Sequence, residues 1–238
     1  MKTVKSLIIL ILVAVVGINT TAFAGTSDKT EKRNVKNFNG IKVSTGIDLY
    51  ITMGNAEEVK IVADDDIIDD IVTEVKDGTL HIYLEKNNWF NWGRFNETRK
   101  AYVTVTQLGL IDASSGSDVR SENTLKGDEL DIEASSGSDI YLDLIYKNVS
   151  LKTSSGSDAK ITGKAKYFSA SASSGSDIVA RDFETEKCQV KASSGSDATV
   201  NVSDELVAKA SSGADIRYYG NPRSKDTNES SGGDISGR

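Results

Sequence analysis

Several residue types are scarce in this chain. Among its 238 residues there is one cysteine (Cys188), one proline (Pro222) and one histidine (His81). A single cysteine excludes an internal disulfide, so packing and hydrogen bonds must hold the fold. Near absence of proline is expected where almost every backbone N–H bonds to a neighbouring strand. His81 alternates with Leu80 and Ile82 and is expected to face solvent, which argues against Ser-His-Asp catalysis.

Long apolar runs are missing except at the N-terminus. Residues 1–24 combine a basic start (Lys2, Lys5), an apolar run from Leu7 to Val16 and the small-residue sequence Ala22-Phe23-Ala24, the layout of a cleaved secretory signal. The run is shorter than the roughly 20 residues that span a bilayer, so we expect no membrane insertion of the mature chain. An uncleaved tethering helix is the alternative. Because no cysteine follows the cleavage site to carry a lipid, the expected destination is the periplasm, the cell surface or the extracellular medium.

Positive charge is not in excess. The formal net charge is −7, and loss of Lys2 and Lys5 with the signal leaves −9. This charge opposes phosphate backbones and anionic membrane surfaces. The sequence therefore argues against nucleic acid as a partner.

What is abundant is a Ser-Ser-Gly-x-Asp unit, present seven times. Its glycines are Gly116, Gly137, Gly156, Gly175, Gly195, Gly213 and Gly232, spaced 18 to 21 residues apart. Apolar and polar residues alternate around each copy, as at Leu130, Ile132 and Ala134, which indicates strands with one buried face. Such short strands bury their apolar faces only when copies stack. The sequence therefore predicts an all-β fold, a single-stranded parallel β-helix (solenoid) with about 19 residues per coil.

The repeated unit is predicted to form the corner of each coil, because glycine adopts positive φ and Ser and Asp bond nearby backbone groups. Counting inward positions two at a time from Leu130 places the second serine of each copy on the core side, where hydroxyls would bond one another. These serines are Ser115, Ser136, Ser155, Ser174, Ser194, Ser212 and Ser231. The aspartates are expected to form an outward ladder: Asp118, Asp139, Asp158, Asp177, Asp197, Asp215 and Asp234.

The N-terminal third lacks the repeat but keeps strand character. After an expected linker at residues 25–37, residues 38–110 form a β-rich part, followed by the seven-coil solenoid at 111–238. Residues 76–79 resemble a hairpin turn. Apolar residues at three- and four-residue spacing favour a short helix within 66–75. We expect this region to cap or flank the coils, since repeat arrays need covered ends.

Five segments resemble a known family: Phe38-Asn-Gly-Ile-Lys-Val43, Gly46-Ile-Asp-Leu-Tyr-Ile51, Ala63-Asp-Asp-Asp-Ile-Ile68, Ile71–Leu80, and Val103-Thr-Val-Thr106 leading into the repeats. The chain, from about residue 35 to about 235, resembles the auto-transporter adhesin, head GIN domain family. This resemblance implies a β-helical surface or periplasmic protein with an adhesin-like role. It supplies no established ligand and no catalytic residues. Gln107 replaces a proline that commonly ends the strand in such proteins, a local departure.

The aspartate ladder is the first candidate site. We expect these residues mainly to form turns. Calcium, which takes six to eight oxygen ligands, is an alternative occupant, although the Gly-Gly-x-Gly-x-Asp pattern of calcium-binding β-rolls is missing. A carbohydrate-active enzyme would need two carboxylates about 5 to 9.5 Å apart with different pKa values, and seven near-identical environments supply no such difference.

Two further features concern Cys188 and an aromatic segment. Cys188 occupies the inward position filled by Leu130, Val149, Phe168 and Leu206 in other copies and is expected to be a core residue. The segment 88–96 holds four large aromatics: Trp89, Phe90, Trp92 and Phe95. Exposed, they would contact a glycan or a cell-surface protein; folded back, they would form an apolar lid.

Together these patterns predict a non-catalytic, extracytoplasmic binding or structural module, adhesin-like at the cell envelope, with no cofactor. The alternatives are a calcium-stabilised structural solenoid and a carbohydrate-active enzyme.

Overall fold

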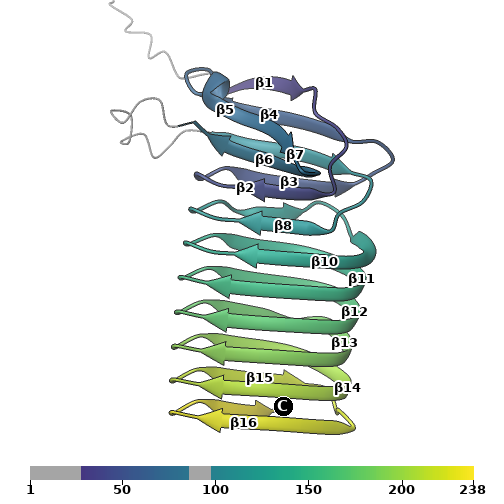
Figure 1. Cartoon of the computed structure of the whole chain (residues 1–238), viewed down its shortest axis with the longest axis vertical. Helices are drawn as coiled ribbons and strands as arrows, with labels where there is room; N and C mark the ends of the chain where they lie inside the picture. The colour runs from purple at the N-terminus through teal and green to yellow at the C-terminus, as the bar shows by residue number, and fades with distance from the viewer. Residues whose placement is uncertain (1–27, 86–97) are drawn as a thin grey trace, which may run out of the picture.

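The computed structural model describes residues 28–85 and 98–238. Strands dominate this part, and its one helical element is the 3-10 turn η1 (Ile68–Asp70). The strands stack into a long column (Figure 1), so the predicted β-solenoid is confirmed. Within these two ranges, no helix has the length and apolar character needed to cross a bilayer.

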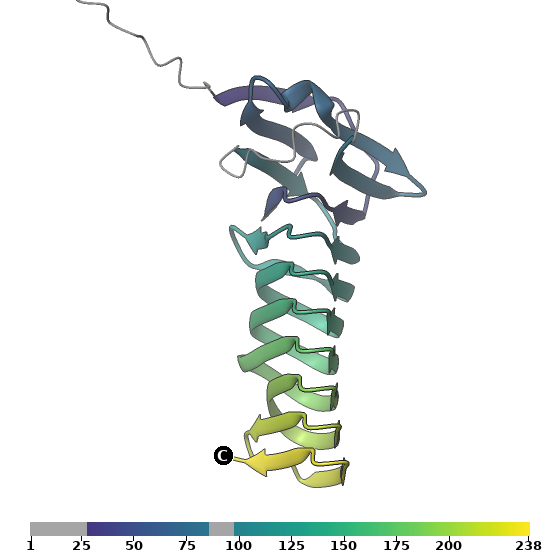
Figure 2. The ribbon, with the colours of Figure 1, turned by 90° about the vertical axis from the view of Figure 1, so that its left-hand side faces the viewer.

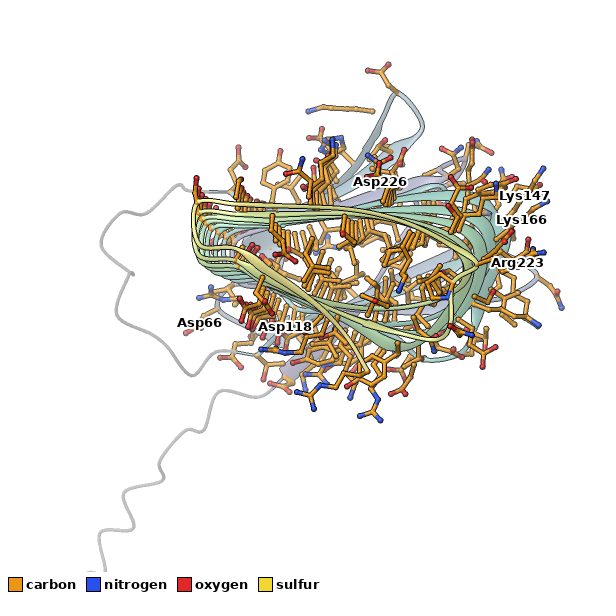
Figure 3. All side chains as sticks on the ribbon, turned by 90° about the horizontal axis from the view of Figure 1, so that it is seen from below. Asp66, Asp118, Lys147, Lys166, Arg223 and Asp226 are labelled. Atoms are coloured by element: carbon orange, nitrogen blue, oxygen red, sulfur yellow. The ribbon has the colours of Figure 1, made fainter. Side chains whose placement is uncertain are left out.

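Two parallel sheets face each other across the core. Along the chain, the strands of one sheet come before each Ser-Ser-Gly corner, and the strands of the other sheet come after it. Before the corner lie β8 (Leu110–Ala113), β10 (Leu125–Ala134), the later segments of β11 (Asp139–Ser154), β12 (Asp158–Ser173), β13 (Asp177–Ser193) and β14 (Asp197–Ser211), and β16 (Ser224–Ser230). After it lie β9 (Val119–Ser121), the initial segments of β11 to β14, β15 (Asp215–Tyr219) and β17 (Asp234–Gly237). β11 to β14 run round the second, rounded end of the coil without interruption (Figure 3).

Equivalent positions of successive coils form apolar columns in the core. One column, by strand register, is Leu130, Val149, Phe168, Cys188 and Leu206. All five are at most 3% exposed. Phe168 also packs edge-to-face on Phe183, with ring centroids 5.2 Å apart. The prediction that Cys188 is a core residue is therefore confirmed.

The corners stack as predicted. In each coil the glycine N–H donates to the carbonyl of the second serine of the next coil, from Gly116 to Ser136 through Gly213 to Ser231, at 3.1–3.2 Å. Both residues are left-handed: the second serines have φ of 50 to 59° and the following glycines 66 to 78°. Glycine suits this conformation because it has no Cβ to clash with the following carbonyl.

The prediction that the second serine faces the core is wrong. Every second serine is exposed, and the serine after the glycine is buried instead. These buried serines are Ser117, Ser138, Ser157, Ser176 and Ser196, all 0% exposed. Counting by two fails because the two left-handed residues interrupt the β alternation. The buried hydroxyls bond mostly to backbone: Ser157 Oγ accepts the Ser138 N–H at 3.2 Å, and Ser196 Oγ donates to the Ala172 carbonyl at 2.9 Å.

The N-terminal third continues both sheets and then covers them. β2 (Gly40–Val43) and β3 (Asp48–Met53) lie parallel to β8 and β9 on one side and to β6 (Thr79–Leu84) and β7 (Arg99–Val105) on the other. β5 (Ile71–Lys76) pairs antiparallel with β6, and β4 (Glu58–Asp64) pairs antiparallel with β7 and with β1 (Asp28–Arg33). Figure 2 shows this part at the upper end of the column.

One coil in this region was not recognised in the sequence. Ser44-Thr-Gly-Ile-Asp48 forms a corner like the others, with left-handed Thr45 (φ 66°) and Gly46 (φ 69°). The Gly46 N–H donates to the Ser115 carbonyl at 3.1 Å. Threonine and isoleucine replace two serines of the repeated unit, which hides the similarity.

Three local predictions have different outcomes. The hairpin is confirmed, because Lys76 pairs with Thr79 around left-handed Asp77 and Gly78. The helix within 66–75 is wrong: only η1 is helical, and β5 begins at Ile71 because its backbone pairs with β6. The prediction of a linker at 25–37 is wrong for residues 28–33. They form β1 (Asp28–Arg33), which pairs with β4.

Candidate functional site

The outward aspartates form a column along the sheet after the corner, beginning with Asp48. We call the set the aspartate column: Asp48, Asp118, Asp139, Asp158, Asp177, Asp197, Asp215 and Asp234. Two carboxylates accept hydrogen bonds from the next coil. Asp158 Oδ1 accepts the Asp177 N–H, and Asp177 Oδ1 accepts the Asp197 N–H, each at 3.1 Å. These two bonds tie neighbouring coils together, and the turn-forming role of the whole column stays a prediction.

Partial burial raises the pKa values of the two members of the aspartate column nearest the N-terminal end. It raises the pKa of Asp48, against the opposing charges of Lys100 and Arg120. It also raises the pKa of Asp118, and the neighbouring Asp48 charge adds to the rise. No group of three or more His, Cys, Asp or Glu side chains within the described ranges could hold a metal ion. Calcium between neighbouring coils therefore stays a prediction.

His81 and Cys188 lie apart from the aspartate column. His81 is on β6, between Glu74 and Lys42 in the sheet before the corner, whereas the column follows the corner. Cys188 is buried, and desolvation raises its thiol pKa to about 12. A thiol with this pKa is almost entirely protonated at neutral pH and is a poor nucleophile.

Two predicted segments lie outside the described residues. They are the signal at 1–24 and the aromatic set Trp89, Phe90, Trp92 and Phe95. The suggestion that these aromatics contact a ligand stays a prediction.

A groove of about 560 Å³ crosses β10 to β14 on the outer face of the sheet before the corner. It lies beside the rounded end. There the strands bend, and two consecutive residues point outward, as at Lys147-Asn148 and Lys166-Tyr167. In Figure 3, which looks along the solenoid axis, Lys147, Lys166 and Arg223 of different coils all project at this end, opposite the sharp corner.

Two rows of outward side chains line the groove, which we call the coil groove. The row nearer the bend is Glu129, Asn148, Tyr167, Lys187 and Glu205. The second row is Asp131, Ser150, Ser169, Gln189 and Val207. The two small serines in the middle of the second row leave the hollow beside the larger side chains.

The coil groove combines an exposed ring with polar and acidic groups. The Tyr167 side chain is 40% exposed, and Lys166 Nζ lies 5.3 Å from its ring centroid. Lys187 Nζ donates to Glu205 Oε2 at 2.8 Å, a hydrogen bond that raises the pKa of Lys187. Because Glu129 and Asp131 join Glu205, the lining has more carboxylates than amines.

The opposite sheet carries a second exposed tyrosine in a different setting. Tyr141 is 38% exposed, and the Arg120 guanidinium lies over its ring at 4.5 Å. Nearer the N-terminal end, Tyr50 and Tyr102 stack with centroids 4.9 Å apart. Tyr141 and Tyr167 thus match in exposure and in having a cation nearby, but Tyr167 is the one that lines the coil groove.

The coil groove was not found from the sequence. A usable signal exists in three of the five coils, those of β11, β12 and β13: each has two consecutive polar or aromatic residues between buried positions, such as Lys166-Tyr167 between Ala165 and Phe168. Such a pair breaks the alternation and marks a bend. The hollow itself is formed by side chains from five coils, so the sequence of a single copy of the repeat does not reveal it.

Fold and surface define a class of protein, a capped parallel β-solenoid with structural corners and an open groove along its outer face. The chain belongs to the family described as "Putative auto-transporter adhesin, head GIN domain", which matches residues 37–222.

Solved structures support the same fold. A putative adhesin from Bacteroides fragilis is 24% identical, with a TM-score of 0.83, and the alignment covers 90% of this chain and 98% of that one. A putative lipid binding protein from Parabacteroides distasonis is 17% identical, with a TM-score of 0.66 and coverage of 88% and 96%. A putative adhesin from Parabacteroides merdae is 16% identical, also at 0.66, with coverage of 89% and 96%. Comparison with curated proteins gives no match.

Proposed function

We propose that the mature chain is a non-catalytic, adhesin-like binding module that acts outside the cytoplasm, at the cell envelope. The observation that carries the proposal is the coil groove, an open surface that presents side chains of five coils in register. Such a surface suits many weak contacts with an extended partner. The family to which the chain belongs, described as adhesins, supports the same role.

The proposal excludes catalysis for a chemical reason. An acid and a base must have pKa values set apart by their surroundings. In the aspartate column, Asp158 and Asp177 repeat one arrangement, each accepting the next backbone N–H, and the pKa values of the neighbours Asp48 and Asp118 are shifted in the same direction, upward, rather than apart. Repetition of this kind supports a structural role for these carboxylates.

Two observations of different kinds support an extracytoplasmic location. Residues 1–24 have the layout of a cleaved secretory signal, and the family is described as auto-transporter adhesins. Cleavage near Gly25 stays a prediction, which N-terminal sequencing of the exported chain would check.

Attachment is tested with the mature chain coupled to fluorescent beads. The beads are applied to immobilised glycans, matrix proteins and vesicles of neutral or anionic lipid. We expect saturable binding to glycans or surface proteins. The bound beads should stay attached at neutral pH, and no enzymatic product should form. Binding to vesicles alone would replace this proposal with a lipid-binding role, the description carried by one structural relative. Binding to none of the three surfaces would overturn the proposal.

The earlier prediction about the aromatic segment is tested in the same assay. If Trp89 and Trp92 contact the partner, replacing both with Ala lowers binding. Unchanged binding would remove that prediction and leave the coil groove as the candidate surface.

A further inference from the structure

The coil groove repeats with the period of the coils. Neighbouring parallel strands lie about 4.8 Å apart, and each coil contributes one residue to each row of the groove. A chain molecule lying along the solenoid axis therefore meets one residue pair for every strand spacing. A pyranose ring is similar in length to this spacing, so a polysaccharide can present one sugar to each coil.

The lining also matches the chemistry of a sugar. The Tyr167 ring offers an exposed apolar surface, on which the C–H face of a pyranose packs. Asn148 and Gln189 beside it carry amide donors and acceptors, and Ser150 and Ser169 carry hydroxyls. These groups pair with sugar hydroxyls, which both donate and accept.

Charge narrows the class of polysaccharide. Three carboxylates line the coil groove, those of Glu129, Asp131 and Glu205. They face two amines, Lys187 Nζ, which is paired with Glu205, and Lys166 Nζ beside the Tyr167 ring. This excess of carboxylates repels uronic acids, sulfated sugars and phosphate groups.

A peptide strand is a poor fit for the same groove. Extended peptides are commonly captured by adding a strand to an open sheet edge. The strands under the coil groove, such as β12 and β13, already pair on both sides. Their backbone groups are used, so side chains alone must recognise the ligand.

We infer that the coil groove binds a neutral polysaccharide lying along the solenoid axis, with Tyr167 as the stacking platform. This inference rests on the proposed binding function and names its ligand class.

The test compares Tyr167→Ala with Tyr141→Ala, its matched control on the opposite sheet. Binding of the mature chain is measured on arrays of neutral glucans, mannans, xylans and galactans, with polygalacturonate and heparin as anionic probes. We expect Tyr167→Ala to weaken binding to a neutral polysaccharide at least about tenfold, as for an aromatic anchor, and Tyr141→Ala to leave it unchanged. Ser169→Gln, which places in β12 the side chain that β13 has in the same row, partly fills the hollow and should also weaken binding.

Several results would overturn the inference. They are equal binding by the Tyr167→Ala and wild-type chains, equal loss in both tyrosine variants, or a preference for the anionic probes. Circular dichroism and thermal melting check that each variant is folded. If the wild type binds matrix protein but no glycan, the ligand class fails while the proposed function survives; if it binds no surface, both fail.

Discussion

The two ends of the solenoid close its core by different means. At the N-terminal end, β1, β4, η1 and β5 cover the coils with further backbone pairing and apolar side chains (Figure 1). Ile61 of β4 and Ile68 of η1 are 0% exposed. This end is closed by additional packed structure.

At the C-terminal end, the last coil closes the core with polar side chains. All seven residues of β16 are exposed. In β16, Lys225, Thr227 and Glu229 align with Leu206, Ala208 and Ala210, which are buried in the coil above.

Two of these side chains fold across the core end. Lys225 Nζ donates to Tyr218 Oη at 3.3 Å, and Glu229 Oε1 accepts the Ile235 N–H at 3.1 Å. Charged residues at inward positions are a known way to keep an edge strand from pairing with another chain. The comparison teaches that an array can end either by a packed cap or by a change of polarity within one repeat.

The largest expected difference between the ends is in stability. Ile68→Ala should lower the free energy of unfolding by about 2 to 5 kcal/mol, because a fully buried side chain leaves a cavity. Ile235→Ala in the half-exposed last coil should cost about 1 kcal/mol or less. Urea unfolding measures both. Similar losses would mean that the two ends contribute alike and would remove the contrast.

A second prediction converts the polar end into an apolar one. The triple change Lys225→Leu, Thr227→Ala and Glu229→Ala places the residues of the preceding coil in β16. We expect concentration-dependent end-to-end association, with affinity at least about tenfold above wild type, or about 1.4 kcal/mol. Light scattering with size exclusion measures it.

The control for this variant is Asp226→Leu with Asn228→Ala, which removes polar groups from the outward positions of the same strand. No association is expected, because these positions do not face the core end. Equal association in both variants, or in neither, would contradict a stop built into the last coil.

The smallest expected effect concerns the aspartate column. Burial raises the pKa of Asp118, so the folded chain holds this proton more tightly than the unfolded chain. The resulting contribution to stability is complete below the unfolded pKa, near 4, and is lost as pH rises through the folded pKa. Asp118→Asn should therefore be more stable than wild type at pH 7, by less than about 1 kcal/mol after solvent screening, and equal to it near pH 3.

Urea titration across this pH range measures the difference. Asp234→Asn, in the exposed β17, is the control at the other end of the column. A gain for Asp118→Asn that persists at low pH would contradict the electrostatic explanation.

Local patterns predicted the repeated part of the fold well and failed where backbone conformation or pairing departs from the pattern. Alternation around Leu130 correctly identified the inward column that contains Cys188. It failed only at the corner itself, where left-handed Ser136 is exposed, and the inward count resumes in phase at Ser138. The apolar spacing near Ile68 resembles a helix, yet β5 pairs with β6 instead, since a complete backbone ladder outweighs local periodicity.

The sequence by itself determined that the copies stack with glycine corners over one another, because a fixed period near 19 residues with alternating apolar positions buries its faces in only that way. Tertiary structure alone decided the packed cap at one end and the groove beside Tyr167, because both arise from residues that are distant in the chain and neighbours only after the coils have stacked.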